Sequence, residues 1–208
     1  MEINRDLPPK VGLFGGTFDP IHKGHLAAAA AVRDRLHLAK VLFIPAGQPW
    51  LKEGRRITPA EQRLEMVKLA IAGKPYFEAS TIEIERPGAT YTVDTLSEIL
   101  KSMGSVEIYV IIGMDTLKDF PRWKDPARLL KLGYLVAVPR PGYARPDTEL
   151  MAVMLPDLKE RLVMLDGPEI DISATEIRQR IAAGRTFADL VPAKVAEYIK
   201  KKWLYKTE

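Results

Sequence analysis

The chain has 208 residues, of which 47% are hydrophobic, and this suits one globular domain with or without a small addition. Its 31 basic and 27 acidic residues give a net charge of +4, an excess that suits a small anionic substrate and does not require nucleic acid. The absence of cysteine excludes a disulfide framework. Residues 1–10 do not resemble a secretory signal, and no apolar run approaches the ~18 residues of a membrane span, so we expect a cytoplasmic protein.

The first half of the chain alternates apolar runs, typical of buried strands, with segments typical of helices. The expected elements are a strand at 11–14, a helix at 27–38, a strand at 41–45, a helix from 60 to about 72, a strand at 77–85 and a helix from about 92 to 103. Thr58-Pro59-Ala60-Glu61 matches a capping box with proline at the first helical position, which predicts the start of the second helix. Residues 46–57 form a polar loop of a length that is often functional.

The second half continues this alternation. The expected elements are a central strand at 106–112, two short helices between 116 and 132 broken near Pro121 and Pro126, a strand at 134–138, a short last strand at 162–165, and helices at 174–184 and 192–204. Strands that alternate with helices favour an α/β fold with a doubly wound parallel sheet. We expect a single domain over residues 1–208, in which residues 173–208 form a small helical subdomain.

Residues 15–25, Gly-Gly-Thr-Phe-Asp-Pro-Ile-His-Lys-Gly-His, form the expected turn between the first strand and the first helix. Ligands of open parallel sheets bind at such turns, outside the carboxyl ends of the strands. Gly15 and Gly16 lack a Cβ, so the backbone there can bend sharply and approach a phosphate closely. His22 and His25 are three residues apart, which puts both rings on one side of a first helical turn. Two imidazoles beside a helix N-terminus can donate hydrogen bonds to phosphate oxygens that gain charge during a transfer.

Other interpretations of this turn are weaker. Neither GxGxxG nor GxxxxGK[ST] occurs there, because Gly12, Gly15 and Gly16 have the wrong spacing. Taken alone, the two histidines could equally be polar residues at a helix start, without chemistry. A zinc site is disfavoured because cysteine is absent and the only further histidine is His37, so we predict no metal held by the protein itself.

Two segments of the chain resemble the motifs of a known superfamily. Residues 16–25 resemble the signature of the nucleotidyltransferases that carry an HxGH motif, and residues 172–178, Ile-Ser-Ala-Thr-Glu-Ile-Arg, resemble their ISSTxIR motif. With Gly113-Met114-Asp115 and the segments 91–96 and 138–142, the closest match is the nicotinate-nucleotide adenylyltransferase family. The resemblance covers about residues 11–178.

This resemblance implies a Rossmann-like nucleotidyltransferase fold and an enzyme of NAD biosynthesis. The adenylyl group of ATP would pass directly to nicotinate mononucleotide, giving deamido-NAD and pyrophosphate, with Mg²⁺ accompanying ATP. His25 would stabilise the transition state and His22 would hold ATP phosphates. The residues implied in ATP binding are Gly15, Gly16, Thr17, Phe18, His22, His25, Gly113, Asp115, Ser173, Thr175 and Arg178. Ala174 stands where the family usually has a second serine, so one hydroxyl is missing.

The resemblance also implies a mononucleotide site formed by Lys52, Thr90, Tyr91, Trp123 and Arg140. Lys52 follows Gln48-Pro49-Trp50-Leu51, so the histidine of the family's PPHK-like element is absent. Trp123 would stack on the pyridine ring, and Arg140 would pair with a carboxylate or phosphate. A plain structural role, as a solvated or packing residue, stays open for each of these positions.

Two further functions stay open at this point. The same chemistry could serve another acceptor, nicotinamide mononucleotide or phosphopantetheine, although the Thr90-Tyr91-Thr92 segment fits pyridine mononucleotides better. A nucleotide-sensing or nucleic-acid-binding domain is the non-enzymatic alternative, but we expect such a domain to have lost one of His22, His25 or Arg178. ATP and the mononucleotide are the expected partners, without nucleic acid or membrane, and a homo-oligomer is left open.

Overall fold

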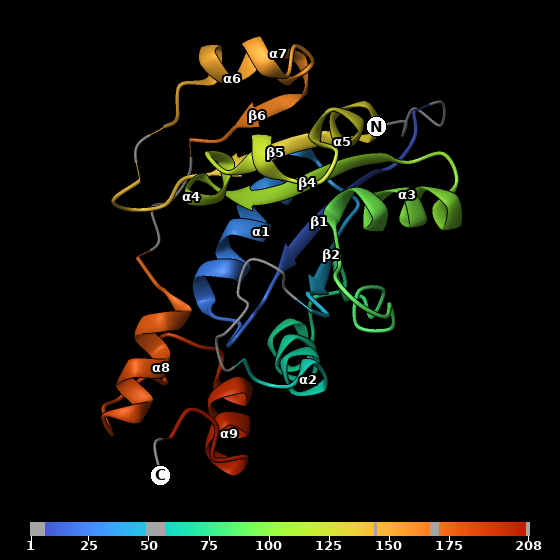
Figure 1. The fold of residues 1–208 in the computed structure, drawn as a ribbon. Helices are drawn as coiled ribbons and strands as arrows, with labels where there is room; N and C mark the ends of the chain where they lie inside the picture. The colour runs from blue at the N-terminus through green and yellow to red at the C-terminus, as the bar shows by residue number, and fades with distance from the viewer. Residues whose placement is uncertain (1–6, 49–56, 144, 167–170, 207–208) are drawn as a thin grey trace.

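The computed structural model describes residues 7–48, 57–143, 145–166 and 171–206 (Figure 1). Within these ranges six parallel strands form one sheet in the order β3-β2-β1-β4-β5-β6. The strands are β1 (Lys10–Gly16), β2 (Lys40–Pro45), β3 (Phe77–Ala79), β4 (Glu107–Gly113), β5 (Tyr134–Val138) and β6 (Leu162–Met164). The chain winds outward from β1 to β3, returns to β4 beside β1 and then winds outward the other way. This order confirms the predicted doubly wound α/β fold.

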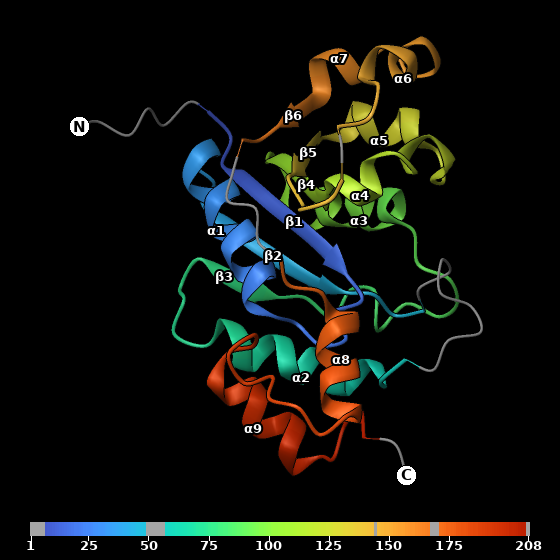
Figure 2. The ribbon, with the colours of Figure 1, turned by 90° about the vertical axis from the view of Figure 1, so that its left-hand side faces the viewer.

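Helices cover both faces of the sheet (Figures 1 and 2). They are α1 (Lys23–Leu36), α2 (Ala60–Ile71), α3 (Thr92–Met103), α4 (Met114–Leu117), α5 (Pro126–Leu132), α6 (Thr148–Met154), α7 (Leu158–Arg161), α8 (Ala174–Ala182) and α9 (Ala193–Lys201), with a 3₁₀ turn at Phe120–Arg122. Buried residues of α1, α2, α8 and α9 join the core on one face, and those of α3 to α7 join the core on the other. No helix of the described ranges is long and apolar enough to cross a membrane.

The central strand β1 is apolar without alternation because both of its faces are covered. Val11 and Leu13 contribute to the core on the side of α3, whereas Phe14 contributes to the core on the side of α1. Successive side chains of a strand point to opposite faces, so a run such as Val-Gly-Leu-Phe fills two cores at once. Gly12 is required by this packing, since a Cβ there would lie 2.9 Å from Leu38 Cδ1.

Two predicted element boundaries near the site are wrong. Helix α1 begins at Lys23, four residues earlier than expected, so His22 is its N-cap with an extended backbone and His25 lies inside the helix. The strand expected at 77–85 ends at Ala79. The amides of Ile84 and Glu85 both donate to the Thr81 carbonyl, at 2.8 and 3.0 Å, and this turn replaces the strand.

The capping box predicted for α2 does not form, because Pro59 is the N-cap and no side chain caps it. Helix α8, expected from residue 174, has a side-chain cap: Ser173 Oγ accepts from the Glu176 amide at 3.1 Å. The helix breaks near Pro121 and Pro126 and the short last strand are also confirmed.

The last two helices lie together with α2 at one end of the molecule, away from α6 and α7 (Figure 2). Helix α9 packs on α2, and its residues Val195 and Ile199 are buried in the core that α1 and α2 share. The treatment of residues 173–208 as a separate subdomain stays a prediction.

Candidate functional site

A cavity of about 530 Å³ opens at the carboxyl ends of β1 and β4. These two strands are neighbours, and the direction of winding reverses between them. In open parallel sheets this reversal leaves a crevice, because the connecting segments leave the two strands toward opposite sides. The cavity therefore lies where the fold itself predicts a ligand site.

Every site residue predicted from the sequence lines this one cavity, except Lys52, which lies outside the described residues. These residues are Gly15, Gly16, Thr17, Phe18, His22, His25, Thr90, Tyr91, Gly113, Asp115, Trp123, Arg140, Ser173, Thr175 and Arg178.

The two histidines stack face to face at the start of α1, with ring centroids 3.6 Å apart and an interplanar angle of 25°. The main-chain amide of His22 donates to Nδ1 of His25 at 3.2 Å. A neutral imidazole that accepts at Nδ1 carries its proton on Nε2, so this contact selects the tautomer in which Nε2 of His25 is the donor.

His22 is almost entirely buried, with 6% of its surface exposed. Burial, aided by the positive charge of Arg140, lowers the pKa of His22 from 6.5 to about 3. The ring is therefore neutral at physiological pH. Its buried Nδ1 has no hydrogen-bond partner among the described residues.

Phe18 borders the cavity, but most of its ring is packed in the core. Its ring is 2% exposed and meets the His25 ring edge-on at 5.0 Å and 82°. Its backbone is left-handed, with φ of 49°. A Cβ on Gly16 would lie 3.0 Å from the Phe18 ring, so glycine is needed at position 16 for this packing.

Arg178 connects the second motif to the first. Its Nη1 donates to the main-chain oxygen of Asp19 at 2.7 Å, and its Nη2 donates to Thr175 Oγ1 at 3.2 Å. The N-terminus of α8 and the turn before α1 are therefore in direct contact, although more than 150 residues separate them. The guanidinium and the imidazole pair border the same cavity.

Arg140 and Asp115 form an ion pair on another wall of the cavity, with Nη1 and Oδ2 2.5 Å apart. Arg140 belongs to the loop after β5, and Asp115 belongs to α4 after β4. A Cβ on Gly113 would lie 2.3 Å from Asp115 Oδ1, so glycine at 113 lets this carboxylate fold back over the strand end. The pair brings one positive group close to a cavity that also holds Arg178.

Tyr91 and Trp123 provide aromatic surface to the same cavity. Lys124 lies over the Tyr91 ring at 4.5 Å and pairs with Asp94 at 2.9 Å. The Trp123 ring packs edge-on against Phe120 at 5.5 Å. Trp123 Nε1 is buried and has no partner among the described residues, so this indole also lacks a hydrogen-bond acceptor.

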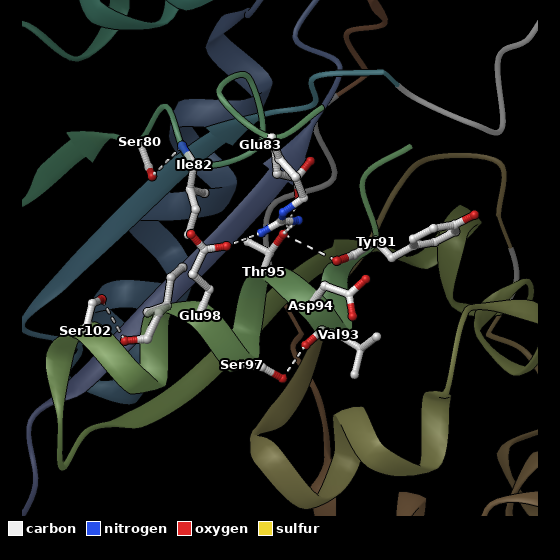
Figure 3. Close-up of polar contacts among 12 residues, drawn as sticks. Ser80, Ile82, Glu83, Tyr91, Val93, Asp94, Thr95, Ser97, Glu98 and Ser102 are labelled. Atoms are coloured by element: carbon white, nitrogen blue, oxygen red, sulfur yellow. Dashed lines mark hydrogen bonds and ion pairs between the residues drawn. The ribbon is translucent and has the colours of Figure 1, made fainter. Parts of the chain in front are cut away.

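Glu83 is a buried carboxyl group of the cavity that the sequence did not reveal (Figure 3). It accepts from Thr95 Oγ1 at 2.8 Å, and Arg86 Nη1 donates to the same Thr95 oxygen at 2.9 Å. Burial raises the pKa of Glu83, while hydrogen bonds from Thr95 and Thr90 oppose that rise. The sequence signal for a buried Glu83 was its position between Ile82 and Ile84. Its partner Thr95 lies on the next helix, so the pairing could not be predicted locally.

Arg63 is a second buried charge that the sequence did not reveal as part of the site. The residue is 1% exposed, and its guanidinium donates to four main-chain oxygens: Thr17 at 2.8 Å, Thr58 at 2.8 Å, Ala46 at 2.7 Å and Gly47 at 3.3 Å. Its spacing from Met66 and Val67 placed it on the apolar face of α2, which was the signal that could have identified it.

The cytidylyltransferase-like family model matches residues 13–180 of this chain. A relative from Dehalococcoides mccartyi, named "probable nicotinate-nucleotide adenylyltransferase", is 49% identical over 94% of this chain and 97% of its own. A relative of the same name from a Roseiflexus species is 48% identical over 94% of this chain and 98% of its own.

Solved structures share the fold at lower identity. The nicotinic acid mononucleotide adenylyltransferase of Plasmodium falciparum, in complex with NaAD, superposes with a TM-score of 0.77 at 17% identity, over 95% of this chain and 97% of that one. A putative nicotinate-nucleotide adenylyltransferase from Vibrio parahaemolyticus superposes with a TM-score of 0.71 at 17% identity, over 96% and 97% of the two chains.

The buried neutral ring of His22 makes stability depend on pH. Below the unfolded pKa of 6.5 only the unfolded chain takes up a proton at this position, until the pH approaches 3. As the pH falls from about 7.5 to 5, this proton uptake by the unfolded chain lowers the free energy of unfolding by about 2 kcal/mol, at 1.36 kcal/mol per pKa unit. We expect the His22→Asn variant to lack this fall in the free energy of unfolding. Urea unfolding of both proteins at the two pH values measures it, and equal losses in the parent and the variant would contradict it.

Proposed function

We propose that this chain, which belongs to the nicotinate-nucleotide adenylyltransferases within the cytidylyltransferase-like family, transfers the adenylyl group of ATP to nicotinate mononucleotide. The products are deamido-NAD and pyrophosphate. One juxtaposition carries this function: the stacked pair His22 and His25 and the guanidinium of Arg178 border one cavity, and Arg178 donates to the turn that precedes the histidines.

The reaction is a direct displacement at the α-phosphorus of ATP. A phosphate oxygen of the mononucleotide forms the new P–O bond while the bond from the α-phosphorus to the pyrophosphate oxygen breaks. Phosphoryl-type transfers of this kind leave the protein mainly the tasks of positioning and charge stabilisation. The Nε2–H group of His25 donates a hydrogen bond to phosphate oxygens as their negative charge grows. His22, neutral by burial, donates to the phosphates without bringing a formal charge.

Two helix starts serve the triphosphate. Gly15, Gly16 and Thr17 end β1 beside the N-terminus of α1, and a Cβ built on Gly15 meets no atom within 4 Å, which supports close approach of a ligand to its backbone. Ser173 and Thr175 begin α8, with Arg178 one turn later. Free amides and the positive dipole end favour anions at such starts. Gly113 and Asp115 serve the adenosine, at the end of β4.

The mononucleotide occupies the wall that carries Thr90, Tyr91, Trp123 and Arg140. Trp123 stacks on the pyridine ring, an interaction of about 0.5–1.5 kcal/mol beyond the buried area. Arg140 exchanges part of its pairing with Asp115 for the incoming anion. Lys52 stays a candidate for this side.

Mg²⁺ enters this reaction with ATP. The described residues include no group of three or more His, Cys, Asp and Glu placed to hold a metal ion. Mg²⁺ commonly retains several waters and binds through substrate phosphates, which fits a site rich in phosphate donors and poor in clustered carboxylates. When bound, the ion neutralises phosphate charge. A cytoplasmic location stays a prediction, in keeping with a cysteine-free chain that uses ATP.

Removal of the His25 imidazole tests the histidine chemistry. We expect His25→Ala to lower turnover by roughly 10²-fold or more, the size found for one donor to a transition-state oxygen. Lys23→Ala, an exposed position in the same first turn of α1, is the matched control and should keep the parent's rate. Pyrophosphate release under saturating substrates measures both, and a His25→Ala rate within a few-fold of the parent would remove His25 from the mechanism.

The choice of acceptor has its own test. We expect pyrophosphate release from ATP with nicotinate mononucleotide at a kcat/KM roughly tenfold or more above that with nicotinamide mononucleotide, because a carboxylate that pairs with a positive group discriminates strongly. Phosphopantetheine should give no release. Equal rates with both pyridine mononucleotides would refute the acceptor but keep the chemistry, and no release with any acceptor would favour a nucleotide-binding domain.

A further inference from the structure

Asp19 lies in the turn before α1, and its polar groups meet three distant segments. Its side chain is 6% exposed, with Oδ1 accepting from the Tyr205 hydroxyl at 2.6 Å and Oδ2 accepting from the Thr58 amide at 3.4 Å. Its main-chain oxygen accepts from Arg178 Nη1 at 2.7 Å. One residue of the turn is therefore tied to the start of α2, to α8 and to the segment after α9.

Tyr205 reaches this position by a defined backbone path. Helix α9 ends at Lys201, and the Leu204 amide donates to the Ile199 carbonyl at 3.1 Å, which folds the following residues back along the helix. Tyr205 itself is left-handed, with φ of 63°, and its hydroxyl also contacts Met66 Sδ at 4.0 Å. Burial and the nearby carboxylate of Asp19 raise the pKa of Tyr205, so the hydroxyl stays protonated and donates.

The charge of Asp19 is balanced from the other side of the turn. The guanidinium of Arg63 is buried and donates to the Thr17 carbonyl at 2.8 Å, two residues before Asp19. Burial lowers the pKa of Arg63 and the charge of Asp19 opposes this shift, so the two groups stabilise each other. The turn is thus held by Arg63 and by Tyr205, the donor that the segment after α9 supplies.

We propose that Tyr205 is a positioning residue for adenylyl transfer, which sets the geometry of the turn and of Arg178 through its hydrogen bond to Asp19. This rests on the function proposed above. Tyr205 does not line the cavity, so it acts through Asp19 and not on substrate. The residues it aligns are those proposed to bind ATP, whereas the mononucleotide wall is formed by the segment just before α3, the connection between β4 and β5 and the loop after β5. Loss of the hydroxyl should therefore affect the use of ATP rather than that of the mononucleotide.

The variant Tyr205→Phe removes the hydroxyl and keeps the ring. We expect kcat/KM for ATP to fall by roughly tenfold or more, since small displacements of positioning groups have effects of up to ~10²-fold. KM for nicotinate mononucleotide should stay within about twofold, because that wall is not tied to Asp19. The proposal would be overturned if kcat/KM of the Tyr205→Phe variant fell equally for both substrates, or if it did not fall for ATP while the parent was active.

Two control variants separate positioning from loss of stability. Met66→Leu removes the sulfur that the Tyr205 hydroxyl contacts but leaves the hydroxyl and its bond to Asp19, and Tyr198→Phe removes a hydroxyl from α9 at a position outside the cavity lining. Both should keep the parent's KM for ATP when assayed well below their melting temperatures. If Met66→Leu raised that KM as much as Tyr205→Phe, the role of Tyr205 would be structural only and the proposal would fail.

A double-mutant cycle tests the route through Asp19. If Tyr205 acts through this carboxylate, Tyr205→Phe should change little in an Asp19→Asn background, whereas independent effects would multiply. Calorimetric titration with a non-hydrolysable ATP analogue gives the same comparison without an acceptor. A parent that binds the analogue but transfers to no acceptor would refute the proposed function alone, and multiplicative effects on analogue binding would refute the role of Tyr205 alone.

Discussion

The buried guanidinium of Arg63 is the constraint on which the site depends. It donates hydrogen bonds to the carbonyl of Thr17, in the connection between β1 and α1, and to the carbonyls of Ala46 and Thr58, which begin and end the connection between β2 and α2. A fully buried cation is expensive unless its donors are satisfied and an opposite charge is near. Asp19 supplies that charge, and in doing so becomes the residue to which α8 and the segment after α9 are joined. The turn between β1 and α1 is thereby held by contacts within the protein itself.

The same fold that creates the cavity also keeps the buried His22 ring neutral. His22 is the N-cap of α1 and its ring is buried, and Arg140 adds a positive charge nearby. Both conditions disfavour a second proton, so His22 is a neutral donor beside the His25 ring. Neutral donors suit a site that also carries Arg178 and Arg140, since further positive charge in one cavity would be costly without the anionic substrates.

Prediction from the sequence succeeded where a pattern was local and failed where it depended on a distant partner. The motif residues from 15 to 25 and from 172 to 178 were recognisable by type and spacing, and all of those predicted for the site border the cavity. The segment 80–85 looked like a continuing strand because Ile82 and Ile84 alternate with polar residues. It instead turns so that Glu83 can meet Thr95 on α3, a partner that no local pattern announces (Figure 3).

The sequence by itself determined the succession of strands and helices along the chain and the buried character of β1 and β4, because these follow from periodicity, capping residues and glycine positions within short windows. The two motif segments were identified by their resemblance to a known family. Only the tertiary structure decided that α1 starts at Lys23, that Arg63 and Asp19 stabilise one turn, and that Tyr205 bonds to a residue 186 positions earlier. Such contacts join groups far apart in the chain, and their energy depends on burial and distance, which exist only once the chain is folded.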